Sequence, residues 1–215
     1  MTQLTPRQFS ETEDLDDWRA LFVGAFAYFR TGSFSAGAEL TAEIARLADA
    51  ANHHPDVDLR YGGVTVRVFS HDVFGLTDRD VALARQISTA ARQRGAAAEP
   101  AAVQVVQVAV DAMSHPDVIP FWQAVLGYDA VGDEDLVDPH GRNASFWFQQ
   151  MDQPRPQRNR IHVDVCVPYD VAEARVAAAV AAGGRILRDD EAPVGWLLAD
   201  PEGNEVDVAT VHTRG

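Results

Sequence analysis

The sequence predicts an α+β protein in which an antiparallel sheet with helices on one face is followed by tandem βαβββ units. Three observations predict it. The composition changes over residues 92–102, where Gly95 can end a helix and Pro100 prevents its continuation. Strand and helix patterns alternate before this break, and one pattern occurs twice after it. We therefore expect two domains, over residues 1–98 and 102–215, joined by a linker.

In the first part, an apolar stretch over residues 18–30 predicts short strands. A helix is expected next, with Ser35 as its N-cap and apolar residues at helical spacing. This helix must end near Asn52, because Pro55 disfavours the helical conformation of the residue before it. Residues 64–69 then alternate between two faces, which predicts a half-buried strand.

The second helix of this part has its own start signal. Thr77 is expected as the N-cap, and Asp80 stands at the spacing of a capping box. Apolar residues then recur at helical spacing from Val81 to Ala91. They predict an amphipathic helix that packs on the sheet.

The part after the break contains a strand–helix–strands pattern that starts twice. The expected elements are a strand over residues 104–111, a helix over 118–126, a strand over 145–150, a strand over 161–167, a helix over 171–182 and strands over 196–199 and 205–209. A turn signal at residues 200–203 joins the last two strands. Cys166 is expected in the core of its strand.

The charge balance restricts the classes of partner. The formal net charge is −14. Nucleic acids and anionic membranes both attract clustered cations, so neither partner is expected. All 18 cationic residues are arginines, which excludes chemistry that needs a lysine nucleophile.

The sequence also predicts a cytoplasmic location. Its longest apolar stretches are interrupted by charges and are too short to span a bilayer. Residues 1–19 contain no basic segment followed by an apolar one. The single cysteine, Cys166, cannot form an internal disulfide.

Three of the seven histidines, His53, His54 and His71, fall within a short span. Imidazole titrates near neutral pH, so a cluster of histidines suits acid–base catalysis. Pro55 restricts the backbone after the pair, and Asp80 can hydrogen-bond one imidazole and set its tautomer. A solvated helix end and a three-histidine zinc site are the alternative interpretations, although the spacing does not favour zinc.

These residues resemble the signature of the pterin-4a-carbinolamine dehydratases. The signature is an acidic residue, His-His-Pro, a strand pair, Ser-His, Gly-Leu-Thr and a final aspartate. The matching residues here are Asp49, His53, His54, Pro55, Tyr61, Ser70, His71, Gly75, Leu76, Thr77 and Asp80. The resemblance is specific from His53 to Asp80, extends more loosely over residues 18–95, and departs at Val57, where the family often has an aromatic residue.

The resemblance implies that the first domain dehydrates a 4a-hydroxytetrahydropterin to a quinonoid dihydropterin, with no cofactor required. The catalytic residues that it implies are His53, His71, His54 and Asp80. His53 and His71 would exchange protons with the substrate, His54 would bind and orient it, and Asp80 would orient a histidine. The implied substrate-binding residues are His54, Asp56, Ser70 and Tyr61.

The second domain resembles the vicinal oxygen chelate superfamily, which includes glyoxalases and extradiol dioxygenases. The resemblance lies in residues 121–128 and in the closing residues 196–209. The superfamily's metal positions correspond to His162, Glu205, Gln107 and Gln149 or the adjacent Gln150. Neutral amides donate less charge to a cation than carboxylates do, so a divalent metal site and a metal-free cleft are both open.

Three hypotheses for the whole chain follow. It is a pterin dehydratase that acts on a small-molecule pterin, a non-catalytic binding or assembly module with the same fold, or a metal-dependent lyase, isomerase or dioxygenase whose main activity lies in the second domain. Both resemblances imply a homo-oligomer, either a dimer or a tetramer.

Overall fold

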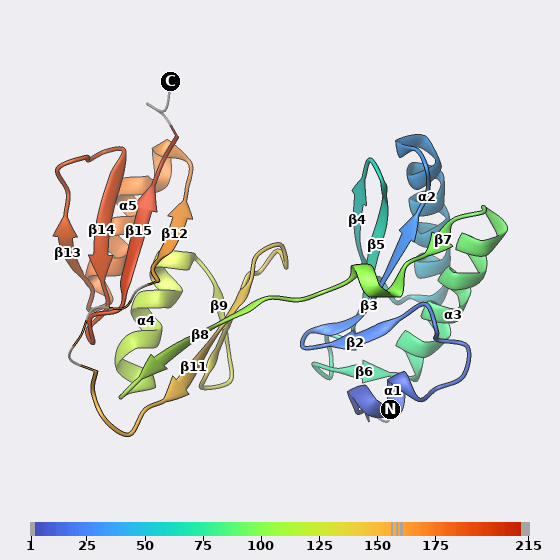
Figure 1. Cartoon of the computed structure of the whole chain (residues 1–215), viewed down its shortest axis with the longest axis horizontal. Coiled ribbons are helices and arrows are strands. Elements are labelled where there is room, and N and C mark those ends of the chain that lie inside the picture. The colour runs from blue at the N-terminus through green and yellow to red at the C-terminus, as the bar shows by residue number, and fades with distance from the viewer. Residues whose placement is uncertain (1–2, 156, 158, 160, 212–215) are drawn as a thin grey trace. The chain divides into compact units, whose positions relative to one another are not determined.

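The computed structural model describes residues 3–155, 157, 159 and 161–211. The chain divides into two units, residues 1–105 and 106–215 (Figure 1). Each unit has a hydrophobic core of its own. Among the described residues, no helix combines the length and the apolar character that crossing a bilayer requires.

The first unit contains an antiparallel sheet in the order β2-β3-β5-β4, in which β7 also pairs with β3. Two long helices, α2 and α3, pack together and contact the sheet. The expected antiparallel sheet with helices is therefore present. The strands are β2 (Arg19–Leu21), β3 (Gly24–Arg30), β4 (Asp56–Arg60), β5 (Gly63–Val68) and β7 (Ala97–Ala98), and the helices are α2 (Phe34–Ala51) and α3 (Asp78–Gln93).

Helix α2 begins two residues earlier than predicted. Its N-cap is Ser33, whose hydroxyl accepts a hydrogen bond from the backbone N–H of Ala36, so the expectation of Ser35 was wrong. Both serines satisfy the local preference for a cap, and only the backbone conformation decides between them. The helix ends at the predicted place, where Asn52 adopts a left-handed conformation with φ 47°.

The first described strand of the chain packs beside the start of α3. Strand β1 (Gln3–Leu4) pairs with β6 (Leu76–Thr77), and the short helix α1 (Pro6–Ser10) follows β1. Helix α3 begins with the predicted capping box, because the hydroxyl of Thr77 and the carboxylate of Asp80 each accept a backbone hydrogen bond. The buried face of α3 includes Asp80 itself, which is fully buried.

The segment predicted to be a linker, residues 92–102, is ordered within the first unit. Helix α3 extends to Gln93, β7 pairs with β3, and a single 3-10 turn, η1, spans Pro100–Ala102. Alanine-rich composition indicated a linker, but the backbone groups of Ala97 and Ala98 complete the edge of the sheet.

The second unit consists of two successive βαβββ halves, as predicted. In each half, the last strand pairs in parallel with the first, and the sheet orders β8-β11-β10-β9 and β12-β15-β14-β13 are equivalent. The first half comprises β8 (Gln107–Ala112), α4 (His115–Leu126), β9 (Asp129–Val131), β10 (Asp135–Val137) and β11 (Ser145–Gln150). The second comprises β12 (Val163–Cys166), α5 (Tyr169–Ala181), β13 (Arg185–Arg188), β14 (Gly195–Ala199) and β15 (Glu205–Ala209).

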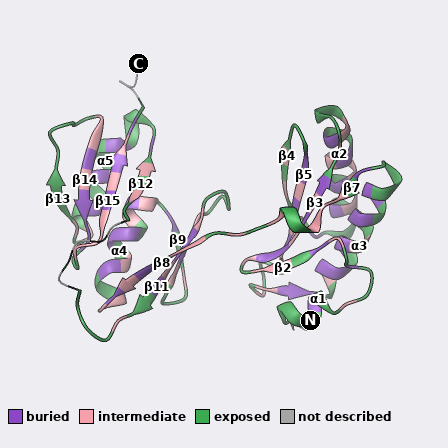
Figure 2. Cartoon of the chain, viewed as in Figure 1, coloured by how far each residue is buried: buried purple, intermediate pink, exposed green. Residues whose placement is uncertain are grey.

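One apolar core joins the two halves of the second unit. It packs α4 and α5 against each other and against the inner faces of both sheets (Figure 2). Trp122 is buried, and its indole N–H donates to Asp200, which lies in the other half. Cys166 is exposed, so the expectation that it lies in the core was wrong. Its strand alternates, and the valines, not Cys166, occupy the inner positions.

Candidate functional site

The structure brings His53 and Asp80 together at the buried centre of the candidate site. His53 follows Asn52, whose left-handed conformation ends α2 and turns the chain toward the start of α3. Nε2 of His53 lies 2.7 Å from Oδ1 of Asp80, and the two side chains are 9% and 0% exposed. An ionised carboxylate only accepts hydrogen bonds, so this contact places a proton on Nε2 of His53. Asp80 thereby sets the orientation and the tautomer of the ring.

The second carboxylate oxygen of Asp80 is held by the chain around it. Oδ2 accepts from the backbone N–H of Thr77 at 2.7 Å and from the hydroxyl of Ser70 at 2.7 Å, and the hydroxyl of Thr77 lies 3.1 Å away. The hydroxyls of Ser70 and Thr77 are also within hydrogen-bond distance of each other, at 2.9 Å. These buried donors stabilise the carboxylate and leave Oδ1 for His53.

Ser70 was predicted to bind the substrate, but in the structure its hydroxyl bonds to Asp80. It is 1% exposed and directs its hydroxyl to Asp80, so it is enclosed by protein and not presented to a substrate. The alternation of residues 64–69 could not reveal this, because Ser70 lies just after the strand, where its N–H and C=O bond to Gly75. Ser70 positions Asp80.

His71 lies on the surface next to this buried network. Its ring is exposed and packs edge-to-face on Phe69, with ring centroids 5.3 Å apart. In the described chain, the His71 ring makes no hydrogen bond to His53 or Asp80. Ser70, the preceding residue, bonds to Asp80, so the backbone of His71 begins beside the network.

An ion pair also connects the turn that contains His71 to the start of α3. The guanidinium of Arg79 bonds to the carboxylate of Asp72 and holds the pKa of that carboxyl below its usual value. Asp72 directly follows His71, and Arg79 and Asp80 both lie in the first turn of α3. This ion pair therefore ties the turn that contains His71 to the end of α3 where Asp80 contacts His53.

His54 and Asp56 lie on the exposed side of the site. Nε2 of His54 is 3.1 Å from Oδ1 of Asp49, and both side chains are largely exposed. Asp56 begins β4 and pairs with Arg67 on the neighbouring strand at 3.0 Å. Both residues are available to a ligand at the end of the hairpin where α2 ends.

Tyr61 is not part of this group. It occupies the turn between β4 and β5, at the opposite end of the hairpin from Asp56, and is 80% exposed. Five residues of extended chain place it roughly 16 Å from Asp56. The signature includes Tyr61 by sequence, but strand length carries its side chain away from the imidazoles.

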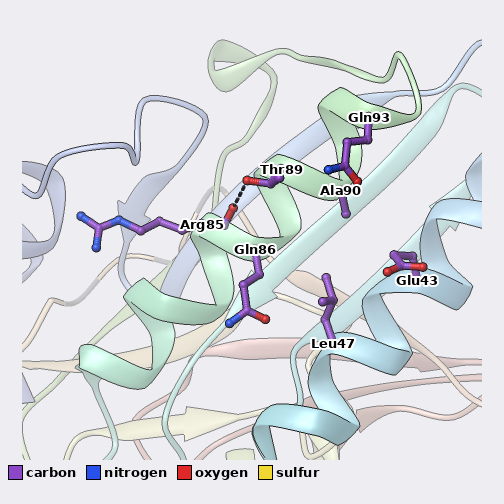
Figure 3. Close-up of a pocket in the computed structure, with 7 residues that line it drawn as sticks. All are labelled: Glu43, Leu47, Arg85, Gln86, Thr89, Ala90 and Gln93. Atoms are coloured by element: carbon purple, nitrogen blue, oxygen red, sulfur yellow. Dashed lines mark hydrogen bonds between the residues drawn. The ribbon is translucent and has the colours of Figure 1, made fainter.

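The first unit also has a shallow hollow of about 350 Å³ between α2 and α3 (Figure 3). It is lined by Glu43, Leu47, Arg85, Gln86, Thr89, Ala90 and Gln93. Arg85 points away from the hollow, while the two glutamines lie along α3. None of the residues that the sequence singled out lines it.

In the second unit, three potential metal ligands lie close together, and two of them were not in the ligand set predicted from the sequence. His162, Asp164 and Asp207 bring one ligand atom each within 4.8 Å of one another. Nε2 of His162 lies 3.2 Å from Asp207 and 3.4 Å from Asp164. Of the predicted residues, only His162 belongs to this group.

Strand geometry explains the difference. Asp164 and Asp207 are register partners on the adjacent parallel strands β12 and β15, on the face opposite Val163 and Val206. Glu205 shares that face but lies two residues earlier on β15. Sequence alternation identifies the face and cannot choose between two acidic residues on it. The signal that could have found Asp207 is its pairing with Asp164.

The two predicted glutamines belong to the other half of the second unit. Gln107 donates to Asp135 on β10 at 3.3 Å, and Gln149 is exposed on β11. Burial raises the pKa of Asp135, while the hydrogen bond from Gln107 lowers it. The side-chain amide of Gln107 therefore already donates a hydrogen bond to a carboxylate of its own sheet.

The pKa of Asp207 shows that negative charge is crowded at the three-residue group. Burial raises this pKa, the nearby carboxylates of Asp164 and Glu205 raise it further, and His162 and Arg188 act in the opposite direction. The net effect is a pKa above the usual value for aspartate. A bound cation would relieve this repulsion.

Comparison with known proteins agrees with the two-unit organisation. Residues 2–90 match the family model described as pterin 4 alpha carbinolamine dehydratase, and residues 107–209 match the model described as glyoxalase-like domain. A solved structure of a transcriptional coactivator/pterin dehydratase from Brucella melitensis is 27% identical, with 42% of this chain and 99% of that chain covered and a TM-score of 0.40. A glyoxalase/bleomycin resistance protein/dioxygenase family enzyme from Burkholderia phytofirmans is 16% identical, with 51% and 99% covered and a TM-score of 0.42.

Curated relatives are similar over part of this chain. A protein of Nocardia farcinica named "Putative pterin-4-alpha-carbinolamine dehydratase" is 40% identical over 80 residues, which are 37% of this chain and 84% of that protein. A Mycobacterium leprae protein of the same name is 34% identical over 88 residues, 40% of this chain and 94% of that protein. This chain, which also carries a glyoxalase-like domain, belongs to the pterin-4a-carbinolamine dehydratase family.

Proposed function

We propose that the first unit dehydrates a 4a-hydroxytetrahydropterin to a quinonoid dihydropterin. The observation that carries the proposal is the buried hydrogen bond between His53 and Asp80, inside the region that matches the dehydratase family. A scaffold without catalytic activity has no need to bury an oriented imidazole beside an exposed one. The non-catalytic binding module is therefore the weaker hypothesis.

The reaction requires two proton movements. The hydroxyl on C4a leaves as water after it accepts a proton, and a ring nitrogen of the pterin loses a proton, so the net products are the dihydropterin and one water molecule. Asp80 occupies Nε2 of His53, which leaves Nδ1 of that ring to exchange a proton with the substrate. His71 exchanges the second proton from the exposed side, and His54 and Asp56 bind and orient the substrate. The residues that we assign need no cofactor.

The proposal is tested with the whole protein and a 4a-hydroxytetrahydropterin generated in the assay by an aromatic amino acid hydroxylase. We expect the quinonoid product to form at a rate proportional to the protein concentration and above the uncatalysed loss of water. Chelation of metal ions is expected to leave this rate unchanged. A rate equal to the uncatalysed one would exclude the proposal.

Size-exclusion chromatography of the same sample tests the expected homo-oligomer.

Replacement of His71 by alanine is expected to lower kcat by about 10²-fold, because it removes one of the two proton-exchanging groups. The ring is exposed, so the free energy of unfolding should change little. The matched control is His140→Ala, an exposed histidine of the second unit, which should keep the wild-type rate. Equal rates for His71→Ala and His140→Ala would remove His71 from the mechanism.

A second proposal concerns the glyoxalase-like unit. We propose that His162, Asp164 and Asp207 bind a divalent metal ion. One imidazole and two carboxylates are donors that divalent transition metals accept, and their ligand atoms already lie within 4.8 Å of one another. Such an ion would supply Lewis-acid polarisation of an oxygen on a bound ligand. In this proposal His162 and Asp207 coordinate the ion, and the more exposed carboxylate of Asp164 contributes a third ligand and a negative charge.

Measurements of metal content and metal affinity test this second proposal. In protein purified without chelators and titrated with Mn²⁺ or Zn²⁺, Asp207→Asn should weaken binding at least about tenfold, because even outer partners of metal ligands have effects of that size. Asp129→Asn, an exposed aspartate of the same unit, is the control. Loss of binding in Gln149→Ala, with Asp207→Asn unaffected, would favour the ligand set predicted from the sequence instead.

A further inference from the structure

Phe74 is a large exposed aromatic residue in an unfavourable backbone conformation. Its φ is 48°, in the left-handed region, and its side chain is 69% exposed. Phenylalanine has no short polar side chain to stabilise this conformation, and exposure of its ring to water is itself unfavourable. Strained residues of this kind cluster at binding and catalytic sites, where the surrounding structure holds them in place.

The surrounding turn holds Phe74 firmly. The backbones of Ser70 and Gly75 bond to each other in both directions, at 2.9 and 3.3 Å, and close the turn. Ser70 is fixed by its bond to Asp80. Gly75 lies against Gln3, where an added Cβ would come within 2.2 Å of the amide nitrogen of that side chain. Both ends of the turn are therefore anchored, and the Phe74 ring is presented at a defined place.

The neighbours of Phe74 connect it to the candidate active site. Phe69 packs edge-to-face on Phe74 at 6.4 Å and edge-to-face on His71 at 5.3 Å. The guanidinium of Arg67 lies 4.9 Å from the centre of the Phe69 ring and pairs with Asp56. We call Phe69 and Phe74 the aromatic shelf. Phe69 thus contacts both the imidazole of His71 and the guanidinium of Arg67.

No aromatic side chain reaches this place from β4. Val57, the position where the resemblance departs, packs against the hydrophobic core of the unit. The shelf is therefore the apolar surface that lies beside His71 in the described chain. A flat heterocycle needs such a surface for its faces and hydrogen-bonding groups for its edge, and Arg67 and Asp56 supply the latter.

We propose that the aromatic shelf, and Phe74 in particular, binds the flat ring of the pterin substrate beside His71. This inference rests on the proposed dehydratase function. The exposed ring of Phe74 and the half-buried ring of Phe69 present far less area than the roughly 800 Å² that each partner buries in a stable protein interface, which favours a small flat ligand over a protein. Phe74 touches the substrate and takes no part in proton transfer.

The experiment compares Phe74→Ala, Phe74→Gly and the wild type. The readouts are KM and kcat for the 4a-hydroxytetrahydropterin, the Kd of a stable 7,8-dihydropterin and the Tm. Both variants should raise KM and Kd about tenfold and leave kcat nearly unchanged, because an aromatic contact with the ring is lost and the imidazoles remain. Phe74→Gly should have a higher Tm than Phe74→Ala, because glycine adopts a positive φ without strain.

Phe34→Ala is the matched control. Phe34 is also an exposed phenylalanine, 52% exposed, but it lies at the start of α2, at the other end of that helix from His53. It should retain the wild-type KM and Kd. The same KM and Kd in both Phe74 variants as in the wild type would overturn the inference and leave the proposed dehydration intact.

Two further outcomes separate the two proposals. A wild-type protein that neither binds the dihydropterin nor accelerates dehydration would overturn the proposed function, and the inference with it. A Phe74 variant with unchanged KM and a changed oligomeric state would show that the shelf is a contact between copies of the chain, which also overturns the inference.

Discussion

Replacement of His53 by alanine is expected to lower kcat for dehydration by about 10²- to 10⁴-fold, the range that general acid–base groups contribute. His53 is the imidazole whose orientation the protein controls, through the 2.7 Å contact with Asp80. Its removal takes away a proton-exchanging group and leaves a buried carboxylate oxygen without its partner. The expected signature is a large loss of kcat with a smaller change in KM.

Stability must be measured in parallel, because His53 is buried. An unpaired buried acceptor costs about 1–3 kcal/mol, so the Tm of His53→Ala should fall. His53→Gln is the matched variant: its amide can still donate to Asp80 and should restore much of the stability, but an amide does not exchange protons as imidazole does. Recovery of kcat in His53→Gln would show that the role of His53 is structural and not catalytic.

Replacement of Asp80 is expected to have the second large effect, and two variants separate its roles. Asp80→Ala removes the acceptor for the backbone N–H of Thr77, the hydroxyl of Ser70 and the ring of His53. It also removes half of the capping box of α3. We expect a loss of about 2–4 kcal/mol in the free energy of unfolding, measured by urea denaturation, from the unpaired buried donors and the lost cap.

Asp80→Asn keeps the shape of the side chain and changes its chemistry. Its amide oxygen can still accept from Thr77 and Ser70, which places the amide N–H₂ toward His53. The ring must then present an unprotonated Nε2 and carry its proton on Nδ1, which reverses the tautomer available to the substrate. We expect kcat to fall about 10²-fold with a smaller loss of stability than in Asp80→Ala. A wild-type kcat in Asp80→Asn would show that the tautomer of His53 does not matter.

Ser70→Ala provides the comparison for both variants. It removes one donor to Asp80 and leaves the contact between Asp80 and His53 in place. Its effect on kcat should therefore be smaller than that of Asp80→Asn. This comparison distinguishes positioning of Asp80 from a direct contact between Ser70 and the substrate, which was the expectation from the sequence.

Much of the fold was predictable because its signals are local. The end of α2 near Asn52, predicted from Pro55, and the capping box of Thr77 and Asp80 each depend on residues within one helical turn. The repeated strand–helix–strands pattern predicted both halves of the second unit. The N-cap of α2 was wrong by two residues, because Ser33 and Ser35 satisfy the same local preference, and α4 begins three residues before its predicted start.

The candidate site was less predictable, because its contacts join residues far apart in the chain. Asp80 was expected to bond to one histidine, and the structure identifies that histidine as His53, which is 27 residues away. The burial of Ser70 and the remoteness of Tyr61 follow from the closure of a turn and the length of a hairpin. Neither can be read from residue spacing in a signature.

The sequence by itself determined the α+β organisation, the C-terminal ends of α2, α4 and α5 to within one residue and the residue types available for acid–base chemistry. Those properties depend on periodicity and on interactions between near neighbours. Only the tertiary structure decided which side chains meet: Asp80 with His53, and Asp164 and Asp207 with His162. The physical reason is that strand register and helix packing set these distances, and both depend on contacts across the whole unit.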